Sequence, residues 1–326
     1  MIVLHPSPQH RAAFGLLAGA MLLGSCPDAT GGPDDTQAPS TSAFTLVGAG
    51  DIASCSHAQD SATAALLDNI PGTVFTLGDN AYPDGTAQDY AMCYGPTWGR
   101  HRARTRPIPG GHDYNTPDAA SYFDYFGDAA GGRGRGYYSY DIGTWHVIAL
   151  NSYLSVGPDS PQGLWLRADL TTHQHRCTLA YWHSPRFSSG TNHGSSTRMQ
   201  LLWDVLYEFG ADVVLNGDEH QYERFAPQDP IGVFDPDHGI RQFVVGTGGR
   251  SDYPFGPLLV NSEVRATGTP GVLVLSLLED SYQWRFVPVA GQTFVDSGSG
   301  SCHDAPPAGA GGSGAHPQAL TERKGV

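Results

Sequence analysis

Five short apolar runs in this chain each deliver an Asp or His side chain at the point where the run ends. The runs span 44–50, 73–78, 106–111, 177–182 and 211–217, and they are followed by Asp51, Asp79, His112, His183 and Asp218. One such ending is ordinary turn chemistry. In open α/β sheets, however, ligands bind at the carboxyl ends of strands. Five endings of this type therefore predict that the side chains converge, and a metal site accounts for the mixture of carboxylate and imidazole groups.

The balance of charges narrows the classes of partner. The chain has 326 residues and a net charge of −14, with 32 acidic against 18 basic side chains. Nucleic acid binding needs patches of Lys and Arg, so we expect no nucleic acid partner. The 42 Gly and 24 Pro residues predict many loops.

The N-terminal segment has the pattern of a targeting signal. Arg11 precedes an apolar run over 12–23, which is too short for a stable membrane-spanning helix. The run leads into Leu23-Gly-Ser-Cys26, which resembles a bacterial lipoprotein signal and makes Cys26 the expected lipidation site. The alternative is plain secretion, with Cys26 in the discarded peptide.

Composition divides the chain into four parts. We expect a signal peptide over 1–26, a flexible linker over 27–42, one folded domain over 43–302 and a disordered Gly/Ala/Pro-rich tail over 303–326. The protein is thus expected to be exported, either membrane-anchored through a lipid on Cys26 or secreted or periplasmic. Contact with a membrane is expected only through that lipid.

Four further cysteines suit an oxidising compartment. They allow three pairings, of which we favour Cys55–Cys93 and Cys177–Cys302. The first pairing joins the loops after Asp51 and Asp79, and the second anchors the C-terminal end to a core strand. A thiolate metal site is the alternative, but no CxxC spacing is present.

The periodicity predicts an α/β fold. Strand–helix–strand alternation leads into a predicted hairpin over 137–150, helices over 162–172 and 196–209, and later strands over 241–245, 271–277 and 282–287. A short helix is also predicted over 89–98. We expect two mixed sheets packed together, with helices outside.

The strand-end motifs resemble a known family in their order and context. These motifs are Gly50-Asp51, Gly78-Asp79-Asn-Ala-Tyr82, Gly110-Gly-His112-Asp113, Trp182-His183 and Gly217-Asp-Glu-His220. Over roughly 44–302 they resemble the calcineurin-like metallophosphoesterases, especially the purple acid phosphatase branch. The resemblance implies a four-layer α/β/β/α sandwich with a dinuclear metal centre that hydrolyses phosphate esters.

The resemblance also implies a set of metal ligands. The first metal takes Asp51, Asp79, Tyr82 and His220, and Asp79 bridges to the second metal. A phenolate is a hard donor that favours Fe(III), so iron is expected at the Tyr82 site.

The second site departs from the family pattern. His183 matches, but Gly111 stands where the family has an asparagine, and Asp218 stands where it has a histidine. We expect Asp218 to serve as a ligand, water to fill the place of the asparagine, and the impaired site to bind Fe, Zn or Mn more weakly.

Several residues are expected to support this centre. His112 and His193 are expected to contact the substrate phosphate and to assist the leaving group. These two histidines and the bridging Asp79 are the expected catalytic residues. Behind the ligands, we expect Asp113 to orient His112, and Asn80 and Arg224 to give structural support.

The sequence therefore predicts an exported phosphoesterase in which a metal-bound hydroxide attacks a small phosphate ester. A non-catalytic, degenerate relative that binds phosphate or a partner at the cell surface is the main alternative, because of Gly111 and Asp218. A structural sandwich with Ca²⁺ bound in acidic loops is a third interpretation. The strand-end histidines disfavour it, since Ca²⁺ prefers oxygen ligands.

Overall fold

The computed structural model describes residues 43–304. The signal peptide, Cys26, the linker and the tail beyond residue 304 lie outside this range. Within it, no helix has both the length and the apolar character needed to cross a bilayer. The first described strand, Phe44–Ala49, lies where the sequence predicts the first strand.

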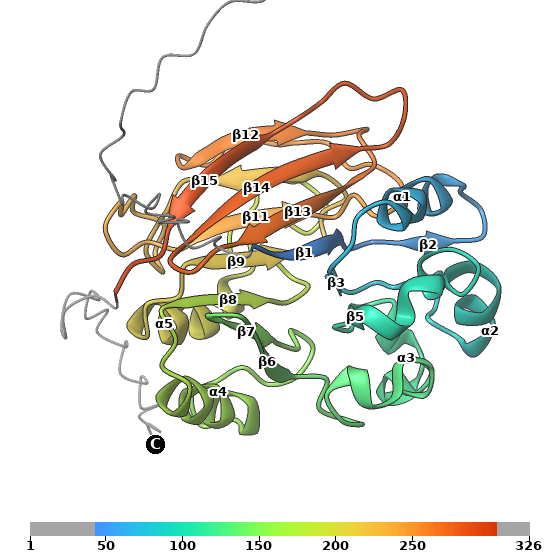
Figure 1. Ribbon diagram of the computed structural model, residues 1–326. Helices are drawn as coiled ribbons and strands as arrows, with labels where there is room; N and C mark the ends of the chain where they lie inside the picture. Colours follow the sequence, from blue (N-terminus) through green and yellow to red (C-terminus); the bar gives the residue numbers. More distant parts are fainter. Residues whose placement is uncertain (1–42, 305–326) are drawn as a thin grey trace, which may run out of the picture. The chain divides into compact units, whose positions relative to one another are not determined.

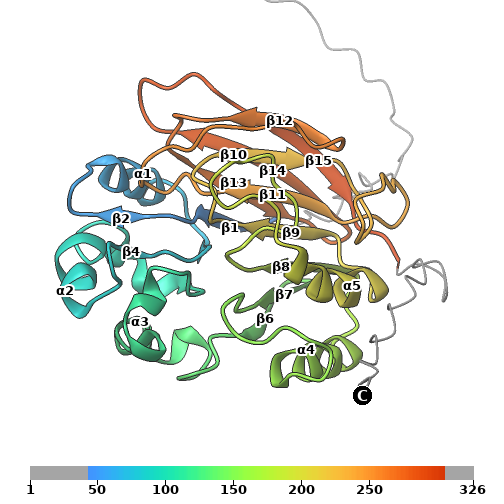
Figure 2. The same cartoon turned by 180° about the vertical axis from the view of Figure 1, so that it is seen from behind.

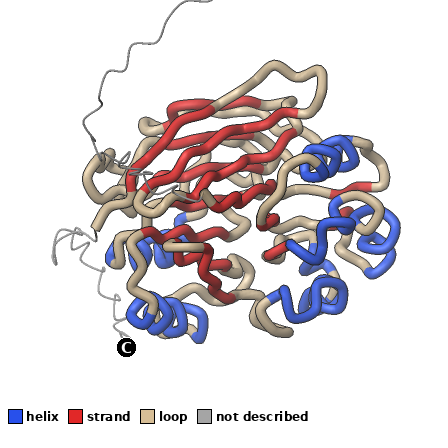
Figure 3. The backbone as a smooth tube through the Cα atoms, viewed as in Figure 1, coloured by secondary structure: helices blue, strands red, loops and turns tan. Residues whose placement is uncertain are grey.

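Two mixed sheets form the centre of the fold (Figures 1 and 3). The first has the order β15-β14-β13-β1-β3-β5, with bounds Ser297–Ser301, Ser281–Pro288, Gly271–Leu277, Phe44–Ala49, Thr73–Thr76 and Thr105–Arg106. The second has the order β12-β10-β11-β9-β8-β7-β6, with bounds Ser262–Ala266, Tyr222–Phe225, Arg241–Val245, Val213–Asn216, Cys177–Tyr181, Trp145–Ala149 and Tyr138–Ile142. A short pair joins β2 (Ala53–Ser54) to β4 (Ala81–Tyr82).

Helices lie outside the sheets, which confirms the predicted four-layer α/β sandwich. The α-helices are α1 (Gln59–Asp68), α2 (Ala87–Asp89), α3 (Ala120–Phe126), α4 (Pro161–Thr172) and α5 (Gln200–Glu208). Figures 1 and 2 show α1 to α3 beside the β1–β3–β5 end, and α4 and α5 beside β6 to β8. Short 3₁₀ segments cover Trp98–Arg104, Asp113–Asn115, Pro117–Ala119, Gly127–Ala130 and Thr197–Met199.

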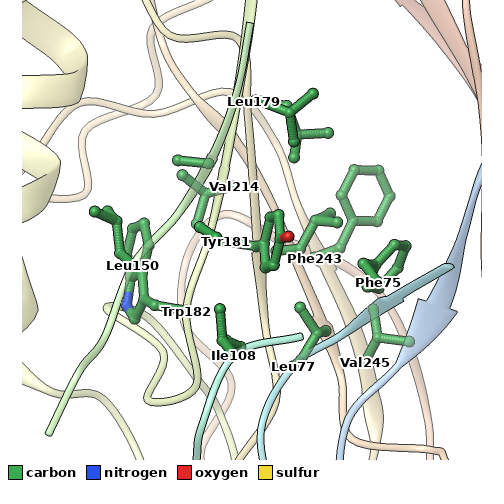
Figure 4. Packing of buried hydrophobic residues seen from close by; sticks show 14 of the residues in the cluster. Phe75, Leu77, Ile108, Leu150, Leu179, Tyr181, Trp182, Val214, Phe243 and Val245 are labelled. Carbon is green, nitrogen blue, oxygen red and sulfur yellow. The ribbon is translucent and has the colours of Figure 1, made fainter. Parts of the chain in front are cut away.

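Apolar side chains from both sheets fill the space between them. Phe75 and Leu77, in and directly after β3, pack near Tyr181 of β8 and Phe243 of β11 in the same buried cluster (Figure 4). The Phe75 and Tyr181 ring centroids are 6.2 Å apart. These strands are apolar on both faces because a parallel sheet covered by a second sheet and by helices has no solvent face.

The parallel strands place their carboxyl ends together. β1 pairs parallel with β3, and Ala49 lies opposite Thr76. β8 pairs parallel with β7 and β9 in the second sheet. The loops of the two sheets meet at these ends: Nδ1 of His183, after β8, lies 2.6 Å from the Leu77 carbonyl, after β3, and the Asp218 N–H, after β9, donates to Oδ2 of Asp51, after β1. These loops carry the predicted ligands.

The short helix predicted over 89–98 forms only in its first half. Residues 89–98 form the end of α2, a π-helical turn over Tyr90–Tyr94 and the start of a 3₁₀ segment. The Gly95 N–H bonds to the Tyr90 carbonyl, 2.7 Å away, which closes the turn. Pro96 follows and has no N–H to continue a helix.

Two disulfides join the favoured cysteine pairs. Cys55 is bonded to Cys93 across 38 residues, and Cys177 is bonded to Cys302 across 125 residues. The first links the residue after β2 to the π-helical turn that follows α2. The second ties the end of β15 to the first residue of β8.

Candidate metal centre

Three aspartates directly after strands have an unusual backbone conformation. Asp51, Asp79 and Asp218 have φ values of 60°, 49° and 72°, in the left-handed region that non-glycine residues rarely adopt. Such strain is typical of functional sites, where the surrounding structure holds it. In each case it turns a carboxylate out of the strand direction and into a common space.

Four donor atoms surround one point next to Asp51. The Tyr82 hydroxyl lies 3.1 Å from Oδ1 of Asp51, 3.0 Å from Oδ2 of Asp79 and 3.2 Å from Nε2 of His220. Nε2 of His220 is in turn 3.4 Å from Oδ1 of Asp51. All four side chains are buried. The structure thus brings together the predicted ligands of the first metal.

The other oxygen of Asp79 faces a second group of donors. Nε2 of His183 lies 3.5 Å from Oδ1 of Asp79 and 3.4 Å from Oδ1 of Asp218. Asp79 therefore presents Oδ2 to the Tyr82 side and Oδ1 to the His183 side. This is the arrangement that a bridging carboxylate between two cations requires.

The donor atoms fit metal ions. Nδ1 of His183 donates to the Leu77 carbonyl, 2.6 Å away, which leaves Nε2 as the free donor on the ring. Among the described residues this buried Nε2 has no hydrogen-bond partner of acceptable geometry. A metal-ligating histidine commonly has its second nitrogen fixed by a carbonyl in this way.

The charges of the metal-free centre also favour a cation. Burial opposes a charge on His183, but the carboxylates of Asp79 and Asp218 raise its pKa well above the usual value. Burial, together with the charges of Asp79 and Asp51, raises the pKa of Tyr82 well above 10. A bound cation would reverse the effect on Tyr82, because it stabilises a phenolate.

Tyr153 fills the space directly beside Gly111. A Cβ built on Gly111 would lie only 2.5 Å from the Tyr153 hydroxyl oxygen and 3.1 Å from Cζ. An asparagine amide oxygen lies about 2.4 Å from its own Cβ by standard bond lengths. The distance from the position of that Cβ to the Tyr153 hydroxyl oxygen is thus about the same as the distance from an asparagine Cβ to its amide oxygen.

Tyr153 is directed towards the second group of donors. Its ring centroid is 6.1 Å from that of His183, and its ring stacks on that of Tyr114 at 5.5 Å. The pKa of Tyr153 is raised to about 12, chiefly by burial. The charges of Asp218 and Asp79 raise this pKa further, whereas that of His183 opposes the rise. The phenol is therefore neutral near pH 7. Sequence analysis missed Tyr153 because no motif follows β7.

The two predicted catalytic histidines lie on either side of the centre. The His112 ring packs on Tyr82 at 4.3 Å, and its backbone N–H donates to Oδ1 of Asp79, 2.8 Å away. Nδ1 of His193 lies 3.7 Å from Oδ1 of Asp218. The His193 loop is held by the buried Glu219, whose Oε1 accepts the His193 N–H at 2.6 Å.

The predicted supporting residues have different positions. Asp113 accepts hydrogen bonds from Asn80 Nδ2 and the Gly110 N–H, both at 2.9 Å, and from the Tyr90 hydroxyl at 2.6 Å. Asp113 and Asn80 thus fix the loops that carry Asp79 and His112. Arg224 pairs with Asp296 at 2.7 Å and with Glu263, so it supports β10 within the sheet.

Two further residues near the centre follow β11. The Arg250 guanidinium lies 5.0 Å from the centroid of the Tyr82 ring. Tyr253 stacks on His220 with a centroid distance of 3.8 Å. The run Gly246–Gly249 that precedes them is typical of a tight loop. Nothing in this run predicts that the loop lies beside Asp51 and its neighbours.

Comparisons with known proteins agree with this geometry. The family model described as calcineurin-like phosphoesterase matches residues 50–222. Purple acid phosphatase 15 of Arabidopsis thaliana is 26% identical over 221 residues, covering 54% of this chain and 42% of the relative. Human acid phosphatase type 7 is 30% identical over 151 residues, covering 39% of this chain and 34% of the relative. The chain thus spans less than half the length of these relatives.

Solved structures show the same fold. A purple acid phosphatase, PPD1, from yellow lupin (Lupinus luteus) seeds has a TM-score of 0.65 at 17% identity, covering 81% of this chain and 54% of its own. GAP50, described as the anchor in the inner membrane complex of Plasmodium, has a TM-score of 0.62 at 13% identity, covering 80% of this chain and 90% of its own. With the family match over more than half of its length, this chain belongs to the calcineurin-like phosphoesterase family and is similar within it to the purple acid phosphatases.

Proposed function

We propose that this protein is a metal-dependent phosphoesterase that hydrolyses small phosphate esters at the centre around Asp79. The observation that carries the proposal is the division of Asp79, whose two oxygens face two separate sets of donors. Bound there, two cations would lower the pKa of water and neutralise charge that develops during phosphate-ester hydrolysis.

The two half-sites favour different ions. We propose Fe(III) for the half with Tyr82, since a phenolate is a hard donor, and Fe, Zn or Mn for the half with His183. The second half lacks the family's neutral amide and one of its histidines. We propose that Tyr153 supplies the missing oxygen and that this half binds its ion more weakly than the first.

The residues around the centre have roles that follow from their exposure. The side chains of His112 and His193 are 41% and 48% exposed, whereas those of the proposed ligands Asp79 and His183 are nearly closed off. We propose that both histidines contact the phosphate and that one of them protonates the leaving alkoxide. Arg250, above the Tyr82 ring, is a further candidate for binding the phosphate.

The experiment is hydrolysis of a chromogenic phosphomonoester, compared with the corresponding diester, after loading with Fe, Mn or Zn. We expect turnover of the monoester in the wild type and its loss in Asp79→Asn, which keeps the shape but removes the bridging charge. Equal turnover by wild type and Asp79→Asn would contradict the proposal.

A non-catalytic, phosphate-binding or partner-binding role is the second candidate. Gly111 and Asp218 favour it, because both differ from the family's ligand pattern. It predicts that the wild type is inactive with every metal and that activity appears only in Gly111→Asn combined with Asp218→His.

We also propose export, with lipid attachment at Cys26. The two disulfides support an oxidising compartment, and Leu23-Gly-Ser-Cys26 supports the lipid. Intact mass of the exported protein tests this: a diacylglyceryl group on Cys26 is expected, and its absence would leave plain secretion.

A further inference from the structure

A second cluster of histidines and aspartates lies away from Asp79. His146 is at the beginning of β7, where Trp145 pairs with Cys177, the first residue of β8. The catalytic loops leave the other, carboxyl ends of these parallel strands. The cluster joins the β6–β7 hairpin to α4 and to the segment between α4 and β8, a part of the fold that Figure 2 shows beside α4.

The contacts centre on the buried ring of His146. Its Nδ1 lies 2.8 Å from Oδ1 of Asp141, which stands opposite it in the hairpin. Its Nε2 lies 2.8 Å from Oδ2 of Asp169 in α4. Nε2 of His175 lies 3.6 Å from the same Asp141 oxygen. One donor atom each of Asp141, His146 and His175 lie within 4.8 Å of one another.

We propose that Asp141, His146 and His175 form a Zn²⁺ site, with Nδ1 of His146, Nε2 of His175 and Oδ1 of Asp141 as ligands. Two imidazoles and a carboxylate are a donor set that zinc commonly takes. Tetrahedral ligands at about 2.0–2.1 Å from zinc lie about 3.3 Å apart. Two of the spacings, 2.8 Å from Asp141 to His146 and 3.6 Å from Asp141 to His175, lie within about 0.5 Å of this value, and the two imidazole nitrogens lie within 4.8 Å of each other. Asp141 and His175, whose side chains are 47% and 26% exposed, would move to close the site.

The surroundings of His146 match those of a metal ligand. Asp169 accepts from Nε2 and is itself held by the Ser139 hydroxyl, 2.8 Å away. A carboxylate that accepts from the second nitrogen of a histidine is the usual way in which proteins orient a zinc-binding ring. The outward-facing Asp141 and His175 leave a path for the ion and room for water as a fourth ligand.

The bound ion would clamp the hairpin to the segment that leads into β8. Binding to the native state alone raises stability with zinc concentration. The site does not depend on the proposed phosphoesterase activity, since its ligands are at the opposite ends of the strands.

The test is zinc titration of the purified, metal-loaded protein by calorimetry, together with the melting temperature in zinc. His175→Ala removes a ligand. The matched control is His173→Ala, because His173 stacks on His146 at 4.9 Å but is not in the proposed ligand set. Zinc taken up by the Asp79 centre is common to all three proteins and cancels in the comparison.

We expect the wild type and His173→Ala to share one zinc-binding event of equal affinity. His175→Ala should bind zinc at this site at least tenfold more weakly, and its melting temperature should no longer rise with zinc. Phosphatase activity should stay unchanged in both variants. Equal zinc affinity in wild type and His175→Ala, or equal losses in His173→Ala and His175→Ala, would overturn the proposal.

Discussion

Exchanging the side chains at positions 111 and 153 tests whether Tyr153 occupies the place of the family's asparagine. Asparagine at position 111 would put Cβ 2.5 Å from the Tyr153 hydroxyl, a distance that real Cβ atoms essentially never show. Gly111 does not have a positive φ, so the backbone itself accepts asparagine. The cost of Gly111→Asn therefore comes from crowding, and we expect about 1–3 kcal/mol.

Removing the tyrosine ring should relieve that cost. Tyr153 is 40% exposed, so Tyr153→Ala alone should lower stability by only about 1–2 kcal/mol. In the double variant the clash is absent. The losses of unfolding free energy in the two single variants should therefore add up to about 1–3 kcal/mol more than the loss in the double variant. Phenylalanine is unsuitable here, because its ring would keep Cζ, now 3.1 Å from the new Cβ.

The assay is denaturant unfolding of the metal-free proteins, followed by titration of the second metal. Tyr153→Ala should weaken binding of the second ion, and adding Gly111→Asn should restore it. Effects on stability that add within about 0.5 kcal/mol would refute the close contact. A second ion bound as tightly by Tyr153→Ala as by the wild type would refute Tyr153 as a ligand.

Three further predictions concern metal binding and the stability of the fold. Gly110→Ala should abolish binding of both metals in a metal analysis, since its Cβ would lie 2.2 Å from Oδ1 of Asp79; retention of two ions would contradict this. Replacing Cys177 and Cys302 by Ser should lower the free energy of unfolding by about 4–5 kcal/mol, because their bond closes 125 residues; a loss below about 1 kcal/mol in denaturant unfolding would contradict it. Burial and the charge of Asp79 raise the pKa of Asp113 to about 6 from 3.8. The fold therefore binds this proton more strongly than the unfolded chain, and the associated stability is present below pH 3.8 and lost as the pH rises through 6. Relative to Asp113→Asn, the metal-free wild type should lose about 2.4 kcal/mol between pH 4 and 7, and parallel pH profiles would show that the shift is absent.

The strand-end residues could be predicted because two local signals coincide. Asp51 and Asp79 each follow an apolar run and a glycine, and parallel strands bring such ends together whatever the rest of the chain does. The Cys55–Cys93 disulfide followed from the same reasoning, because both cysteines come soon after these ends.

Contacts made by residues outside a motif could not be predicted. Tyr153 reaches the centre only because Gly111, some forty positions earlier, leaves space for it. Strand β15 reads Ser-Gly-Ser-Gly-Ser and has no apolar pattern. Its glycines Gly298 and Gly300 lie against the rings of Trp284 and Tyr282, where a Cβ would clash. Such reasons depend on tertiary neighbours rather than on the local sequence.

The histidines of the distal cluster show the same limit. His146, His173 and His175 lie in two segments that share no metal-ligand spacing, so the sequence alone gives no reason to group them. Only the pairing of β7 with β8 and the position of α4 bring them into contact.

Metal content combined with the visible spectrum of the iron-loaded protein tests the central claim, that Asp51, Asp79, Tyr82 and His220 hold an ion together. The geometry predicts one tightly held iron per chain after mild dialysis, with a tyrosinate-to-iron absorption band that persists in Tyr153→Phe and disappears in Tyr82→Phe. Iron bound without that band, or a band unchanged in Tyr82→Phe, would contradict the assignment of this centre.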